Sequence, residues 1–126
     1  MSSIAPFDAW ITFGYTRDLE ATARFYEGVL GLPLAVDQGS CRIWKVRDGA
    51  YVGFCDRPQP ERGGVMLTLV TDDVDGWQQR LEEAGVPIDK PAQVNAEYGL
   101  YHLFCRDPNG YVVEIQRFED PRWDRA

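Results

Sequence analysis

Hydrophobic positions follow the period of a strand and then that of a helix, and this order occurs twice. An aromatic and β-branched run over residues 10–15 predicts a strand. The next segment places apolar residues every three or four positions, at Leu19, Ala23, Tyr26 and Leu30. This spacing predicts a helix over residues 19–30 with one apolar face.

The second half of the chain repeats the pattern. A strand is predicted over residues 65–70, followed by apolar residues at Val74, Trp77, Leu81 and Ala84. Thr16 and Thr71, which open the two copies, are 55 positions apart, whereas the closing Gly31 and Gly85 are 54 apart. An internal repeat of two units indicates a pair of related modules rather than a solenoid.

Helix boundaries carry the same signals in both copies. Asp18 and Asp73 precede the apolar stripes and can accept a backbone hydrogen bond as N-caps. A glycine and then a proline follow each stripe, in Gly31-Leu-Pro33 and Gly85-Val-Pro87, which are stop signals. We expect Trp77 and Tyr26 to belong to the core.

A hairpin is predicted after the first helix. Strand-like residues 41–46 and 50–55 flank Asp48-Gly49, a dipeptide typical of a type I′ turn. If Arg47 pairs with Ala50, alternation places four residues on one surface: Trp44, Tyr51, Gly53 and Cys55.

A second hairpin is predicted near the end of the chain. Residues 100–106 and 111–118 flank Asp107-Pro-Asn-Gly110, the signature of a type I turn. The predicted fold is therefore α+β, with one domain (1–126) built from two tandem βαβββ modules. Module one spans 7–60 and module two spans 62–118, with a linker at 57–64 and a tail at 119–126.

Composition narrows the classes of function. The apolar content of 44% supports a real core, and no long apolar run or secretory leader is evident, so we expect a soluble, cytoplasmic protein. A net charge of −7 disfavours nucleic acid and membranes as partners and suits a neutral or cationic ligand. Three widely spaced cysteines indicate no disulfide framework, and we expect them to be reduced.

The chain resembles the vicinal oxygen chelate superfamily over residues 7–118. The motifs that carry the resemblance are Asp18-Leu-Glu, Phe25-Tyr26, Leu30-Gly-Leu, and Asp107-Pro-Asn-Gly followed by Glu114. The superfamily includes glyoxalase I, extradiol dioxygenases, fosfomycin-resistance thiol transferases and bleomycin-resistance proteins. The resemblance implies a cupped mixed sheet with helices on its convex side and a ligand on its concave face.

Metal-dependent members of this superfamily usually carry a His or Gln on the first strand of each module and a Glu late in a last strand. The corresponding first-strand positions hold Ile11 and, approximately, Met66, and neither side chain is a ligand. Glu114 alone stands at a family position for a carboxylate ligand, although Cys55 could bind a soft metal as a thiolate. We therefore expect no metal centre and no cofactor.

Aromatic residues predict a lining for the cup. Phe13 and Tyr15 share a strand face with Ile11, and the first hairpin adds further rings. The expected ligand-binding set is Ile11, Phe13, Tyr15, Trp44, Tyr51, Cys55, Met66, Tyr98, Phe104 and Gln116. Such a surface can hold a flat or hydrophobic molecule, with cation–π attraction if it is positive. Ordinary sheet packing or a dimer interface are the alternatives for each aromatic.

His102, the single histidine, lies on a predicted strand next to the one that carries Glu114. Three interpretations are open: a hydrogen-bonded pair within the sheet, a pair that contacts ligand and moves a proton, or joint metal coordination.

Two functions follow from these observations. The first is a metal-free protein, similar to the bleomycin-resistance branch, that binds or sequesters a small hydrophobic or aromatic compound, neutral or cationic, in an aromatic-lined cup. The second is a lyase- or transferase-like enzyme that uses His102 and Glu114 catalytically, with or without an atypical divalent metal. The resemblance also implies a homodimer.

Overall fold

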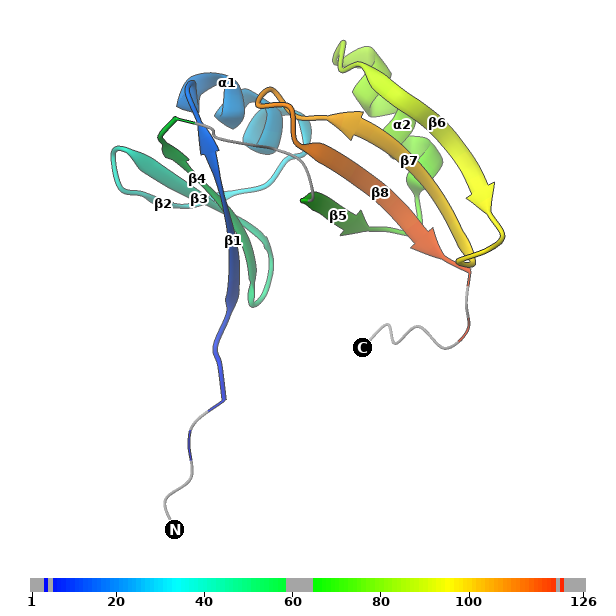
Figure 1. Ribbon diagram of the computed structural model, residues 1–126, viewed down its shortest axis with the longest axis horizontal. Coiled ribbons are helices and arrows are strands. Elements are labelled where there is room, and N and C mark those ends of the chain that lie inside the picture. Colours follow the sequence, from blue (N-terminus) through cyan, green and yellow to red (C-terminus); the bar gives the residue numbers. More distant parts are fainter. Residues whose placement is uncertain (1–3, 5, 59–64, 120, 122–126) are drawn as a thin grey trace. The chain divides into compact units, whose positions relative to one another are not determined.

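The computed structural model describes residues 4, 6–58, 65–119 and 121, and the chain divides into two compact units, 1–60 and 61–126 (Figure 1). The first unit contains β1 (Trp10–Thr16), α1 (Leu19–Ala23), the π-helical η1 (Arg24–Val29), β2 (Leu34–Asp37), β3 (Cys41–Arg47) and β4 (Ala50–Asp56). The second contains β5 (Met66–Val70), α2 (Val74–Glu83), β6 (Ile88–Asn95), β7 (Leu100–Arg106) and β8 (Val112–Phe118). The predicted α+β fold of two βαβββ modules is confirmed. Most of the predicted linker and tail lies outside the described residues.

Each unit forms a four-stranded mixed sheet with the same topology. The strand orders are β1-β4-β3-β2 and β5-β8-β7-β6. The first strand of each unit pairs in parallel with the last, and the other pairs are antiparallel. In each unit the helix packs on one face of the sheet, and the other face is left open.

Both helices begin with the same capping arrangement. Asp18 and Asp73 each accept a hydrogen bond from the backbone N–H three residues later, at 3.0 Å. The hydroxyl groups of Thr16 and Thr71 accept hydrogen bonds from the N–H groups of these aspartates, at 2.9 and 3.1 Å. The predicted caps are confirmed, and the repeated threonines belong to them. Such a cap contributes about 1 kcal/mol.

The first helix changes from α to π after Ala23. The N–H of Leu30 donates to the carbonyl of Phe25 at 2.9 Å, five residues earlier, which widens the turn. Phe25 and Tyr26 are both buried. Phe25 was not in the predicted stripe, because a period of 3.6 does not describe a π turn. Within the described part of the chain, no helix is long and apolar enough to cross a membrane.

The first hairpin differs from the sequence prediction. Arg47 lies opposite Ala50 as expected, but the register then shifts, so that Lys45 faces Tyr51 and Trp44 faces Val52. The turn is not type I′, because among the described residues positive φ occurs only at glycines and Asp48 is not one of them. One extra residue on β3, at a β-bulge, moves Trp44 to the opposite face from Tyr51.

Trp44 consequently belongs to the core of the first unit and not to its open face. It is 0% exposed and stacks on Tyr26, with ring centroids 6.0 Å apart. Its indole Nε1 donates to Glu27 Oε1 at 3.0 Å, which satisfies the buried N–H. Phe54 completes this aromatic cluster at 4.9 Å from Tyr26.

The core of the second unit lies between α2 and its sheet. Its buried residues are Val74, Leu81, Leu103, Cys105, Val113 and Ile115. Burial, reinforced by the carboxylates of Asp89 and Asp107, raises the pKa of the Cys105 thiol to about 11. The predicted core position of Trp77 is wrong in part, since this side chain is half-exposed beside Arg80.

The second hairpin turns at Asp107 as predicted. The N–H of Gly110 donates to the carbonyl of Asp107 at 3.1 Å, which closes the turn. The Asp107 carboxylate also accepts from the N–H groups of Asn109 and Tyr111, at 2.9 and 2.8 Å. These bonds fix where β8 begins and therefore which of its side chains face away from α2.

We predict that Trp44→Ala destabilises the protein by about 3–5 kcal/mol, because it leaves a cavity beneath the helix and removes the hydrogen bond to Glu27. Trp10→Ala is the matched control. Trp10 is 76% exposed, so its loss should change stability by no more than about 0.5 kcal/mol. Urea unfolding measures both values. Equal losses in the two variants would contradict the assignment of Trp44 to the core.

Candidate functional site

The open face of the first unit carries a row of large apolar side chains. In the parallel pairing of β1 with β4, Ile11 lies beside Tyr51, Phe13 beside Gly53 and Tyr15 beside Cys55. Because side chains alternate along a strand, these six residues lie on the face of the sheet opposite to the buried Val52 and Phe54. Ile11, Phe13 and Tyr15 are 42%, 49% and 41% exposed. The structure thus groups five members of the predicted ligand-binding set, without Trp44.

Gly53 gives this face its shape. A Cβ atom at Gly53 would lie 2.6 Å from the ring of Phe13 and 3.2 Å from Cγ1 of Ile43. The Phe13 ring therefore rests directly on the backbone of β4, where a larger side chain would displace it. The result is an aromatic ring held against the sheet with about half of its surface open.

Cys55 is joined to Cys41 by a disulfide, so the expectation that all three cysteines are reduced is wrong for this pair. The two residues face each other across β3 and β4, with Cα atoms 4.0 Å apart. The bulge in the hairpin sets this pairing, and the sequence prediction did not include it. Cys105 is buried and is not part of a disulfide.

The open face of the second unit carries a hydrogen-bonded polar cluster. His102 Nδ1 lies 2.6 Å from Glu114 Oε2, and the hydroxyl of Thr68 donates to Glu114 Oε1 at 2.9 Å. The His102 and Glu114 side chains are 8% and 6% exposed. In the neutral tautomer that donates from Nδ1 to the Glu114 carboxylate, Nε2 carries the lone pair.

Other predicted residues surround this cluster. Gln116 lies opposite His102, and Phe104 lies opposite Glu114 with its ring 4.7 Å from the imidazole.

Met66 is on the same face, two residues before Thr68, and is 50% exposed. Tyr98 is on the turn after β6 and is 65% exposed, so it belongs to the turn and not to the sheet face.

The residues present do not fit the divalent metal centre of metal-dependent relatives. Ile11 and Met66 offer no donor atom, and both oxygens of Glu114 already accept or share hydrogen bonds. Among the residues that the structure describes, no three His, Cys, Asp or Glu side chains come together to hold an ion. The absence of a metal remains a prediction that metal analysis can test.

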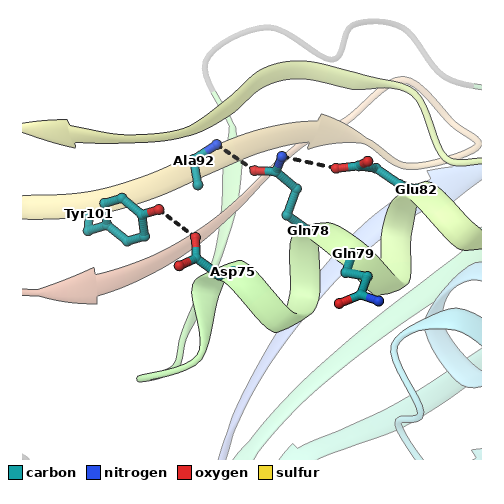
Figure 2. A pocket seen from close by; sticks show the side chains of 6 residues that line it. All are labelled: Asp75, Gln78, Gln79, Glu82, Ala92 and Tyr101. Carbon is teal, nitrogen blue, oxygen red and sulfur yellow. Dashed lines mark hydrogen bonds between the residues drawn. The ribbon is translucent and has the colours of Figure 1, made fainter.

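A polar groove of about 280 Å³ lies on the helix side of the second unit (Figure 2). It is lined by Asp75, Gln78, Gln79, Glu82, Ala92 and Tyr101, and none of them was a predicted site residue. Gln78 accepts from the N–H of Ala92 at 2.7 Å and donates to Glu82 at 2.9 Å, while Tyr101 donates to Asp75. Because its polar groups bond to one another, this groove joins α2 to β6 and β7.

Sequence reasoning missed two residues at these faces, Thr68 and Cys41. Alternation along β5 could have found Thr68, since it shares a face with Met66 and lies opposite Glu114. Cys41 could have been found only from the bulged register, for which the sequence carries no clear signal.

Solved structures with a similar fold are numerous. A lactoylglutathione lyase from Agrobacterium tumefaciens is 24% identical with a TM-score of 0.76, covering 95% of this chain and 100% of its own. A glyoxalase/bleomycin resistance protein/dioxygenase from Nocardioides is 17% identical with a TM-score of 0.76, covering 99% and 93%. TioX from Micromonospora sp. ML1 is 20% identical with a TM-score of 0.74, covering 86% and 97%. At these identities the likeness shows the fold alone.

Among curated proteins, no match was found. Residues 12–115 match the family model described as Glyoxalase/Bleomycin resistance protein/Dioxygenase superfamily. This match extends from β1 to β8 and agrees with the duplicated βαβββ topology. The chain belongs to the glyoxalase/bleomycin resistance protein/dioxygenase superfamily.

Proposed function

We propose that the protein binds a small hydrophobic or aromatic molecule, neutral or cationic, on the open face of its first unit. The observation that carries this proposal is the row of Ile11, Phe13 and Tyr15, which are 41–49% exposed on one strand. Large apolar side chains gathered on one exposed face mark an interaction site more often than scattered ones do. The family includes proteins named for bleomycin resistance, and metal-free binding suits a row of Ile11, Phe13 and Tyr15 that carries no His or carboxylate side chain.

Physical chemistry limits the kind of ligand. The half-open ring of Phe13 and the phenol of Tyr15 offer faces for stacking, and burial of the ligand against them provides most of the binding energy. A positive ligand gains cation–π attraction and is favoured by the net charge of −7, which repels anions. The proposed role is sequestration of the molecule without a chemical change.

We predict that N-phenyl-1-naphthylamine, a neutral fluorescent aromatic probe, binds to this face. Phe13→Ala should weaken its affinity about fivefold or more, equivalent to ~1 kcal/mol, because the stacking ring is lost. Gly53→Ala should also weaken binding, because the new Cβ displaces the Phe13 ring. Fluorescence titration measures the dissociation constants.

The matched control is Phe7→Ala, because Phe7 is fully exposed outside the strands. Its affinity should stay within about twofold of the parent protein. Anilinonaphthalene sulfonate, which adds a negative charge to the same aromatic scaffold, should bind more weakly at low salt. Equal affinities in Phe13→Ala and Phe7→Ala would place the probe elsewhere and refute the proposed face.

Catalysis is the second candidate, favoured by the 2.6 Å contact between His102 Nδ1 and Glu114 Oε2. The carboxylate, itself held by Thr68, orients the imidazole so that Nε2 can take or give a proton. This geometry suits a lyase- or transferase-like step on a bound substrate, and one relative of similar fold is a lactoylglutathione lyase.

If this candidate acts as a lyase on lactoylglutathione, Glu114→Gln loses at least about 100-fold in rate, because the imidazole is no longer oriented. Glu97→Gln is the control, since Glu97 is exposed on the turn after β6. Mass spectrometry of the purified protein measures metal content in parallel. No turnover and less than about 0.1 metal ion per chain would contradict a metal-assisted lactoylglutathione lyase activity.

We also propose a homodimer in the cytoplasm. β1 is an edge strand of the first unit's sheet, and an edge strand favours association with a second copy of the chain. Light scattering should give a mass of about 29 kDa, twice the 14.3 kDa of the chain. A mass that stays at 14.3 kDa at high concentration would contradict the dimer.

A further inference from the structure

Backbone hydrogen bonds surround the Cys41–Cys55 disulfide. The backbone N–H of Gln38 donates to the carbonyl of Cys41 at 2.8 Å, and the N–H of Asp56 donates to the carbonyl of Ser40 at 2.7 Å. The antiparallel pairing of β3 with β4 continues from this end towards the turn. Backbone pairing of β3 with β4 therefore also holds the two cysteines opposite each other, in addition to the covalent bond.

Both cysteine residues of the disulfide are partly exposed on the open face. Cys41 and Cys55 are half-exposed, in contrast to the fully buried Cys105. Cys55 lies beside Tyr15 in the register of β1 with β4, so the sulfur pair ends the apolar row. A small thiol can approach a half-exposed disulfide, whereas it cannot approach a buried one.

We propose that Cys41 and Cys55 form a reversible thiol–disulfide couple that exchanges with small thiols of the glutathione class. A thiolate attacks Sγ of one cysteine, the S–S bond breaks, and its electron pair leaves on the other sulfur, which takes a proton from water. A second thiolate then attacks the mixed disulfide, giving the second protein thiol and the oxidised small molecule. The protein gains two electrons and two protons, and two small thiols are oxidised to one disulfide.

The two states differ at the edge of the first unit's open face. The oxidised state presents a single cystine beside Tyr15, and the reduced state presents two thiols on directly opposite residues of β3 and β4. The ratio of reduced to oxidised small thiol in solution thus determines whether this surface presents a disulfide or two thiols. The inference rests on register and exposure in β3 and β4, and it stands independently of the proposed ligand.

Glutathione buffers test the couple in the folded, full-length chain. The protein is equilibrated at a series of ratios of reduced to oxidised glutathione, quenched and labelled with a maleimide at pH 7, and its mass is measured. We expect labelled thiols to rise from zero to two in one transition that depends on the square of reduced glutathione over oxidised glutathione. Cys105 should stay unlabelled because it is buried and its raised pKa keeps it protonated.

Two variants separate the couple from other thiol chemistry. Cys105→Ala should leave the transition midpoint within about twofold of the parent. Cys55→Ser should replace the transition by a glutathione adduct on Cys41, with a first-power dependence on the glutathione ratio. Circular dichroism should show the same secondary structure in the oxidised and reduced parent protein.

Two results would overturn the proposal. One is that both thiols label at every ratio, which means that the disulfide does not form in the folded chain. The other is that the disulfide resists reduction until denaturant unfolds the protein, which means that it is a permanent cross-link. Both results come from the parent protein, so the test holds even if Cys55→Ser fails to fold.

Discussion

The parallel pairing of the first strand of each unit with its last strand places every side chain of the two open faces. Because side chains alternate along a strand, this register decides that Phe13 lies beside Gly53 and that Thr68 lies beside Glu114. A shift of one residue in either pairing would turn these side chains towards the helix. The helix caps and the Asp107 turn matter to the site because they fix where the paired strands begin.

The duplication places different chemistry at equivalent positions. Phe13 and Gly53 in the first unit occupy the places that Thr68 and Glu114 occupy in the second. In one copy an aromatic ring covers a residue that has no side chain, and in the other a hydroxyl group bonds a carboxylate. The same strand order thus supports an apolar face in the first unit and a polar face in the second, which is how a single fold can host unrelated functions.

Local sequence signals predicted the fold because they were consistent with one another. The repeated caps and the Asp107 turn each determine their own segment and agree with the structure, and the helix periods locate both helices although the first becomes π-helical after Ala23. Trp44 was misplaced because one bulged residue reverses the alternation of β3, and a bulge depends on strand pairing more than on local composition. The disulfide was missed for the same reason. The pairing of His102 with Glu114 was within reach because adjacent strands place them on one face.

The two open faces differ in how far contacts within their own unit already pair their polar groups and cover their apolar side chains. Glu114 accepts or shares hydrogen bonds through both oxygens, so the buried His102–Glu114 pair is stable within the sheet without any ligand. Ile11 and Phe13 are in the opposite situation, because nearly half of each apolar side chain remains exposed and the hydrophobic effect favours covering it. A binding partner therefore has more to gain at the first unit than at the second. This difference is the physical reason to place ligand binding on β1 and to treat the histidine pair as the secondary candidate.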